Sequence, residues 1–220
     1  MKSKVSWLEI VMLAAPFIVL AIYWNDLPSR IPVHWNIRGE IDGWSGKIPG
    51  LFLLPLTMLG VVTLLHILPR FDPRLQRTTG AESRMPAVLP IIRVAFLALF
   101  NTIFFVQIAV SLGKTVAAGR IIMTCVLLFF VVLGNYLGNV RPNYFIGIRT
   151  PWTLENPETW RATHRLGGRL MFFGALILLV GQLFLSEQHF GLAFVVGILS
   201  LAVWGFVYSW HHCRTHVATR

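Results

Sequence analysis

Hydrophobic residues are gathered into about six long apolar runs, separated by segments that carry most of the polar and charged residues. A helix needs about 20 apolar residues to cross the hydrocarbon core of a bilayer, and each run is close to that length. The pattern therefore predicts an all-α integral membrane protein of about six transmembrane helices. The expected spans are Trp7–Trp24, Ile48–Leu68, Ala87–Leu112, Ile121–Leu137, Gly167–Leu185 and Phe190–Trp210.

The composition points the same way. Of the 220 residues, 55% are hydrophobic and 13% are charged, whereas soluble domains carry about 25% charged residues. Six spans leave room for connecting loops but for no separate soluble domain. The apolar run that follows Lys2 and Lys4 is longer than the core of about 7–15 residues in a signal peptide, so we expect an uncleaved first helix.

The distribution of positive charge predicts the orientation. With the N-terminus inside, the inner segments hold thirteen Lys and Arg and the outer loops hold five. Because cytoplasmic loops collect these residues, both termini are expected inside. The net charge of +10 then reflects topology rather than nucleic-acid binding. The inner residues are Lys2, Lys4, Arg70, Arg74, Arg77, Arg84, Arg141, Arg149, Arg161, Arg165, Arg169, Arg214 and Arg220.

The outer loop at residues 25–47 is long and rich in Trp, Pro and Gly, which indicates a shaped and functional segment. Asp42-Gly43 predicts a turn within it. His34 and Asp42 suggest a hydrogen bond that holds the loop, a peptide contact, or a metal or proton-transfer pair. The candidate ligand-binding residues are His34, Trp35, Asp42, Trp44 and Lys47.

The inner loop at residues 138–166 is also long. Asn156-Pro157-Glu158 predicts a helix that starts at Pro157 and leads into the fifth span. Arg161 and Arg165 fall on one face of it, suited to anionic lipid headgroups or to an acidic partner. The segment before this helix is either a functional motif or a re-entrant or surface plug whose polar groups bond one another. The candidate residues are Arg141, Asn143, Tyr144, Arg149, Thr150, Trp152, Asn156, Trp160, Arg161 and His164.

Several polar residues lie within the predicted spans. Glu9 and Arg93 are near the inner ends of their helices, where each is expected to snorkel separately to the surface rather than to pair. The uncharged residues are expected to form hydrogen bonds between helices. They are Asn101, Gln107, Asn135 and Gln182. Gly134-x-x-x-Gly138 permits close approach of helices and is a weak signal for dimerisation.

No catalytic motif, cofactor or resident metal is expected. The sequence has no nucleophile elbow, phosphate-binding loop or paired catalytic carboxylates. Cys125 and Cys213 do not indicate a disulfide. His212 and His216 in the tail suit either a metal site or a frayed polar terminus, of which we favour the second.

Two stretches resemble a known family. Gly134–Gly168, which reads GNYLGNVRPNYFIGIRTPWTLENPETWRATHRLGG, resembles the signature of SdpI-like bacterial membrane proteins. Leu27–Lys47, LPSRIPVHWNIRGEIDGWSGK, resembles the small membrane domain often found at their N-terminus. The resemblance implies a two-helix unit over residues 1–68 and a four-helix unit over residues 69–220, in the bacterial cytoplasmic membrane.

The resemblance also implies a function. The best-known member of the family gives immunity to a secreted killing peptide, and holds an autorepressor of the ArsR type at the membrane when that toxin is present. By this resemblance the outer loop would contact a peptide toxin, and the inner loop would report its binding to a cytoplasmic repressor. Three alternatives stay open: a transporter or channel along the polar residues of the spans, a membrane enzyme, and a structural module without ligand.

Overall fold

The structure is a computed structural model that describes residues 5–76 and 85–216. Lys2, Lys4, Arg77, Arg84 and Arg220, which entered the orientation count, lie outside the described residues. The elements in chain order are α1 (Trp7–Tyr23), β1 (Arg30–Trp35), β2 (Ile41–Gly46), α2 (Lys47–Phe71), α3 (Pro73–Gln76), α4 (Met85–Ser111), α5 (Ala118–Leu137), α6 (Pro151–Glu155), α7 (Pro157–Gly181) and α8 (Glu187–His216).

The predicted all-α membrane architecture is confirmed. Within the described residues, five helices are long and apolar enough to cross a membrane, namely α2, α4, α5, α7 and α8. The sixth, α1, has 17 residues, which at about 1.5 Å per residue places it at the lower limit for a span. Large apolar side chains such as Ile18, Leu53, Ile177 and Leu199 are exposed on these helices, as expected where lipid is the solvent.

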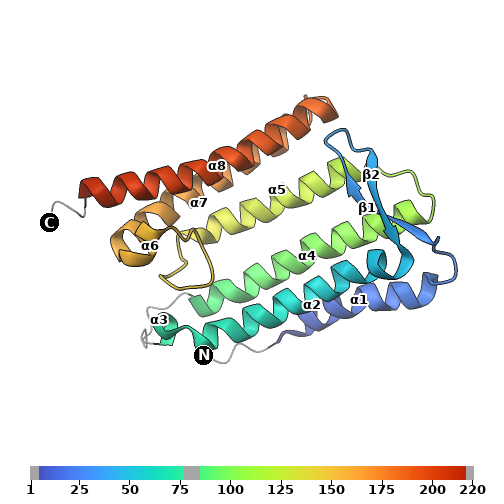
Figure 1. The fold of residues 1–220 in the computed structure, drawn as a ribbon, viewed down its shortest axis with the longest axis horizontal. Coiled ribbons are helices and arrows are strands. Elements are labelled where there is room, and N and C mark those ends of the chain that lie inside the picture. Colours follow the sequence, from blue (N-terminus) through green and yellow to red (C-terminus); the bar gives the residue numbers. More distant parts are fainter. Residues whose placement is uncertain (1–4, 77–84, 217–220) are drawn as a thin grey trace.

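The long helices lie side by side, and the connecting segments gather at two ends (Figure 1). The hairpin of β1 and β2 lies at one end, which we call the hairpin end. The helices α3 and α6 lie at the other, which we call the inner-loop end. The helix α4 packs against α1 and α2 as well as α5, while α7 packs against α5 and α8.

Two apolar clusters join these helices. Met58 and Val62 of α2 pack with Leu97 of α4, and all three are almost fully buried. Leu127 of α5 and Phe190 of α8 pack in a second cluster with Ala175 of α7. The buried clusters thus join the six long helices to one another.

Glycines allow a close contact between α5 and α7. A Cβ built on Gly134 would lie 2.6 Å from the backbone nitrogen of Phe172 and 2.8 Å from the carbonyl oxygen of Gly168. A Cβ on Gly168 would lie 2.7 Å from the carbonyl oxygen of Gly134. The Gly134-x-x-x-Gly138 pattern therefore permits a helix contact within one chain, and this contact accounts for the pattern without a dimer.

Glu9 and Arg93 correct a second expectation. Arg93 Nε donates to Glu9 Oε1 at 2.6 Å, and the two side chains are 1% and 0% exposed. His66 Nε2 of α2 lies 3.7 Å from the other carboxylate oxygen. The prediction of separate snorkelling was wrong because α1 and α4 bring the two charges together, where their mutual attraction offsets part of the cost of burying them.

Three of the four uncharged polar residues of the spans, Asn101, Gln107 and Gln182, bond between elements as predicted. Asn101 of α4 donates to the carbonyl of Met12 in α1 at 3.0 Å. Gln182, at the end of α7, accepts from the Thr124 hydroxyl of α5 at 2.8 Å. Asn135 is exposed on α5. The hydrogen bonds of Asn101 and Gln182 join different pairs of helices.

Candidate functional site

The outer loop folds into an antiparallel hairpin, a feature that the sequence analysis did not specify. Its strands pair Arg30 with Gly46 and Pro32 with Trp44, and the register shifts on either side of His34. The turn lies at residues 36–40, where Gly39 has a φ of 76°. Asp42-Gly43 lies inside β2, so the turn predicted there was wrong.

An asparagine explains the position of the turn. Asn36 Oδ1 accepts hydrogen bonds from the backbone N–H of Arg38 at 2.8 Å and of Glu40 at 3.1 Å. This Asx-type arrangement closes the loop before Asp42-Gly43 is reached. The hydrogen bond from Asn36 Nδ2, followed by the charge of Arg38, holds the pKa of Glu40 below its usual value.

The base of the hairpin is fixed to the helices. Ile31 is fully buried against residues of α2 and α4. Gln107 of α4 donates to the carbonyls of Pro32 at 2.9 Å and Gly50 at 3.2 Å. Lys47 Nζ donates to the carbonyls of Trp24 at 2.5 Å and Leu27 at 2.7 Å. The ammonium group of Lys47, a predicted ligand contact, is thus occupied in holding the end of α1.

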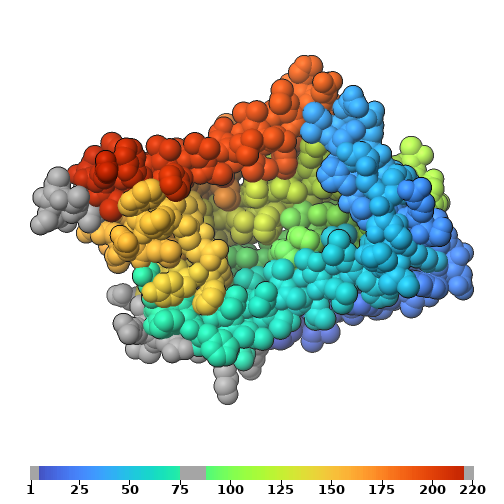
Figure 2. Space-filling view, in the orientation of Figure 1, coloured from blue at the N-terminus to red at the C-terminus, as the bar shows by residue number. Residues whose placement is uncertain are grey.

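The tip of the hairpin crosses to the other side of the bundle. A Cβ on Gly119, in the first turn of α5, would lie 2.8 Å from Gly39 Cα. A Cβ on Gly191 of α8 would lie 2.7 Å from the carbonyl oxygen of Ile37. Figure 2 shows the light-blue hairpin meeting the orange start of α8. The hairpin therefore bridges α1, α2 and α4 to α5 and α8.

The remaining predicted residues of the hairpin lie on its surface. His34 Nδ1 is 2.5 Å from Asp42 Oδ1, with the side chains 69% and 43% exposed. Trp44 is 50% exposed, and the Arg30 guanidinium lies 5.9 Å from its ring centre. Trp35 is half-buried. The structure thus brings an ionisable pair and an exposed indole onto one short hairpin.

The inner loop is organised around a buried asparagine. Asn143 is fully buried. Its Nδ2 donates to the carbonyls of Arg141 at 2.8 Å and Ile146 at 2.9 Å. Its Oδ1 accepts from the N–H groups of Phe145 at 2.8 Å and Ile146 at 2.6 Å. One side chain therefore forms hydrogen bonds with four backbone groups of the loop, where no helix or sheet provides partners for them.

Trp160 and His164 fix the loop to α7. The indole N–H of Trp160 donates to the Val140 carbonyl at 2.8 Å. The indole ring of Trp160 stacks on the imidazole ring of His164, with the ring centres 4.0 Å apart. His164 Nε2 accepts from the Ile148 N–H at 3.0 Å, so this nitrogen is unprotonated. Nδ1 then carries the proton and donates to the Trp160 carbonyl at 2.8 Å. Gly147 is required beside this ring, because its φ is 120° and a Cβ there would clash with Nε2.

The end of the loop is tied to α7 and α8. Asn156 Oδ1 accepts from the N–H groups of Glu158 and Thr159, which confirms the predicted start of α7. Thr150 caps α6 and its hydroxyl donates to the Ser209 hydroxyl of α8 at 2.9 Å. Trp152 packs edge-on against Phe206 of α8, with ring centres 5.0 Å apart.

The predicted inner-loop residues thus fall into two groups. Those that build the loop are buried or half-buried, and they are Asn143, Thr150, Trp152, Asn156, Trp160 and His164. Tyr144, Arg149 and Arg161 are exposed and Arg141 is half-buried. Among the predicted residues of this loop, the exposed side chains belong to this second group. The interpretation of the loop as a plug whose polar groups bond one another describes the first group well.

Sequence reasoning missed two residues of this site. Asp72 is fully buried and accepts from the Tyr144 N–H at 2.8 Å and the Arg74 N–H at 2.8 Å. Arg74 donates to the Leu154 carbonyl at 2.7 Å and covers the Tyr144 ring at 4.4 Å. Asp72-Pro73 is a helix-start signal, but nothing in the sequence places it beside a loop 70 residues away.

We expect Asn143→Ala to destabilise the inner loop strongly. It removes four hydrogen bonds and leaves buried backbone groups unpaired, at about 1 kcal/mol or more for each group. Thermal unfolding in detergent and limited proteolysis within residues 138–156 measure the effect. Asn25→Ala, at an exposed asparagine, is the control. Equal stability of the two variants would show that this hydrogen-bond cluster does not hold the loop.

The fold and the two sites define a multi-pass protein of the cytoplasmic membrane, with a hairpin at one end and a hydrogen-bonded loop at the other. Residues 139–209 match the SdpI/YfhL protein family, and residues 11–59 match a domain of unknown function, DUF1648. The first match covers most of the inner loop and the two helices after it, so this part of the chain is similar to the SdpI-like family, as the resemblance of Gly134–Gly168 predicted.

One curated relative extends this similarity to the full length. The Immunity protein SdpI of Bacillus subtilis (strain 168) is 26% identical over 211 residues, which are 96% of this chain and 97% of the relative. No solved structure shows a significant match to the chain. The division into units of residues 1–68 and 69–220 stays a prediction.

Proposed function

We propose that this protein is a membrane immunity protein, which protects the bacterium that makes it against a secreted antimicrobial peptide. The observation that carries the proposal is the similarity to Immunity protein SdpI over nearly the whole of both chains. Because the similarity includes the hairpin as well as the inner loop, it supports a shared function better than a match to one segment would.

The hairpin is the surface on which we place the peptide. In the predicted orientation it faces the outside, where a secreted peptide arrives before it reaches the bilayer. Trp44 offers an exposed indole next to the guanidinium of Arg30, and tryptophan and arginine are enriched among residues that dominate binding energy. His34 and Asp42 lie on the same hairpin and supply polar contacts.

Binding at the hairpin can reach the rest of the molecule through its bridging position. Gln107 fixes its base to α2 and α4, while Gly39 and Ile37 lie against α5 and α8. A peptide that binds two arrangements of these helices unequally would shift the population between them. The inner loop connects α5 to α7, so a change in the contact between these two helices would reach it.

The exposed side chains of the inner loop are where we place a cytoplasmic partner. Tyr144, Arg149 and Arg161 present aromatic and positive groups there, which suits an acidic surface. The resemblance suggests a repressor of the ArsR type as this partner. A fluorescently tagged repressor of that type, expressed with this protein, should move to the membrane when the peptide is added. A repressor that stays in the cytoplasm would remove this part of the proposal.

We expect Trp44→Ala to lose most of the protection. An exposed tryptophan at the centre of a contact is worth about 2 kcal/mol or more, which is roughly thirtyfold in affinity. The assay is survival of peptide-sensitive bacteria that express equal amounts of each variant in the membrane. Trp7→Ala is the matched control, because Trp7 is 75% exposed and lies at the start of α1, far along the chain from the hairpin.

The outcomes separate the parts of the proposal. Protection that is retained by Trp7→Ala and lost by Trp44→Ala supports contact at the hairpin. Equal protection by the two variants would reject the hairpin as the contact surface while leaving immunity standing. Failure of the unaltered protein to protect against the killing peptide of the related system would reject that peptide as its target.

A further inference from the structure

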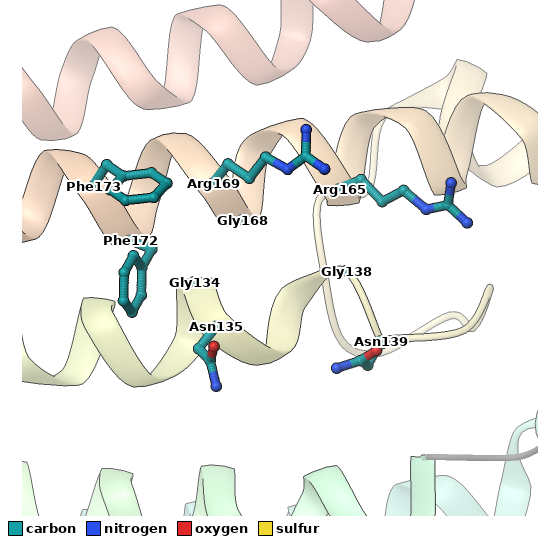
Figure 3. Close-up of a pocket in the computed structure, with 9 residues that line it drawn as sticks. All are labelled: Gly134, Asn135, Gly138, Asn139, Arg165, Gly168, Arg169, Phe172 and Phe173. Carbon is teal, nitrogen blue, oxygen red and sulfur yellow. The ribbon is translucent and has the colours of Figure 1, made fainter.

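A surface groove of about 450 Å³ lies between α5 and α7, towards the inner-loop end (Figure 3). Sites for small molecules occupy about 300–1,000 Å³. Gly134 and Gly168 line it where the two backbones meet, and longer side chains rise on either side. None of the residues predicted to bind a toxin or a repressor lines this groove.

The groove is strongly positive. Arg165 and Arg169, one helical turn apart on α7, both line it and are exposed. Within the described part of the chain, neither is in a salt bridge, and no acidic residue is among the lining residues. The carbonyl end of α5 contributes only about half a negative charge. Two full positive charges exceed it, so the groove favours an anion.

The polar and aromatic parts of the groove lie at opposite ends. Figure 3 shows that the guanidinium groups of Arg165 and Arg169 extend towards the start of α7, whereas Phe172 and Phe173 lie at the other end. Asn139 lies near the arginine end. Since α7 runs from the inner-loop surface into the membrane, the charged end meets the headgroup layer and the aromatic end meets the acyl chains.

We propose that this groove binds an anionic phospholipid from the leaflet at the inner-loop end, which the predicted orientation makes the cytoplasmic leaflet. The phosphate accepts from the guanidinium groups of Arg165 and Arg169, which match phosphate oxygens in planar, bidentate geometry. Asn135 and Asn139 supply amide groups to the glycerol and headgroup oxygens. The first part of an acyl chain lies against Phe173.

A lipid fits better than a soluble anion. A free phosphate would use the charged end alone and leave the aromatic end without a partner. Phe173 is 58% exposed and lies on the membrane part of α7. A soluble anion would have to leave water to contact it. The amphipathic order of the groove matches a molecule that is charged at one end and apolar at the other.

Native mass spectrometry of the full chain, released from detergent with a defined added lipid, tests the proposal. The probes are phosphatidylglycerol, phosphatidylcholine with the same acyl chains, and inorganic phosphate. The double variant Arg165→Gln, Arg169→Gln is compared with Arg149→Gln, Arg214→Gln. Both lower the net charge by two at exposed arginines near the inner-loop end, but only the first pair lines the groove. Thermal unfolding without added lipid checks that both variants fold.

We expect the unaltered protein to retain phosphatidylglycerol in preference to phosphatidylcholine. The groove variant should bind it at least about tenfold more weakly, because it loses two charge-assisted contacts, while the control pair stays within about twofold. An equal loss in the two double variants would overturn the proposal, since surface charge alone would then explain binding. Equal retention of phosphatidylcholine, inorganic phosphate bound as tightly as the lipid, or a dimer that excludes lipid from the groove would each overturn it as well.

Discussion

Leucine in place of Gly168 is expected to separate α5 from α7 and to prevent stable folding. Even the first carbon of the new side chain would lie 2.7 Å from the carbonyl oxygen of Gly134. Both helices would have to move, because the obstacle is backbone and cannot rotate away. Overpacking in ordinary cores costs about 1–3 kcal/mol, and we expect at least the upper end of that range here.

A glycine on the same helix provides the control. Apart from its chain neighbours and the backbone of its own helix, Gly174 of α7 has no heavy atom within 4 Å of the position of a Cβ, so Gly174→Ala should be neutral or stabilising by up to about 1 kcal/mol. Gly168→Ala should be clearly destabilising. Thermal unfolding in detergent and the yield of monodisperse protein measure the difference. Similar stability for Gly168→Ala and Gly174→Ala would contradict the close approach of the two backbones.

Glu9→Ala is expected to be the most damaging change of a charged residue in the bundle. Arg93 is 1% exposed and donates to Glu9 over 2.6 Å, so removal of the carboxylate takes the acceptor of Nε and the opposite charge away from a buried guanidinium. Breaking one partner of a buried ion pair costs about 3–5 kcal/mol. We expect weak membrane accumulation and a markedly lower unfolding temperature in detergent.

The double variant Glu9→Leu, Arg93→Leu separates the charge from the packing. If the cost of Glu9→Ala comes from burying the Arg93 charge without the opposite charge of Glu9, removal of both charges should recover most of the stability. Glu40→Ala is the control for loss of a carboxylate, since the Arg38–Glu40 pair has side chains 62% and 61% exposed and such pairs contribute about 0–1 kcal/mol. A double variant as unstable as Glu9→Ala would show that the helices need this ion pair itself.

Patterns within short segments of the sequence predicted the helices well. The apolar runs predicted the membrane helices, and Asn156-Pro157 predicted the start of α7 to the residue. Helix caps and apolar runs depend on neighbours within a few positions, which is why they can be recognised without a fold. The hairpin was less accessible, since one loop holds two turn signals and Asn36 closes the chain before Asp42-Gly43 is reached.

The candidate site was predicted as two sets of residues. Which of them are buried in the structure and which are exposed was not predicted. The sequence marks Asn143 and Arg149 as polar residues of one loop, yet the first is buried at the centre of four hydrogen bonds and the second is exposed. From the sequence, Lys47 was predicted to contact a ligand, but in the structure its ammonium group donates to two backbone carbonyls. Burial depends on what packs against a side chain, and that is not a local property.

The sequence by itself determined the membrane class, the approximate spans and the family resemblance, because these follow from hydropathy and from continuous motifs. Tertiary structure alone decided which distant residues meet. It paired Glu9 with Arg93 and set Gly134 against Gly168. It also carried the hairpin across the bundle to α5 and α8. Each of these contacts joins segments separated along the chain, and the packing of whole helices fixes them together.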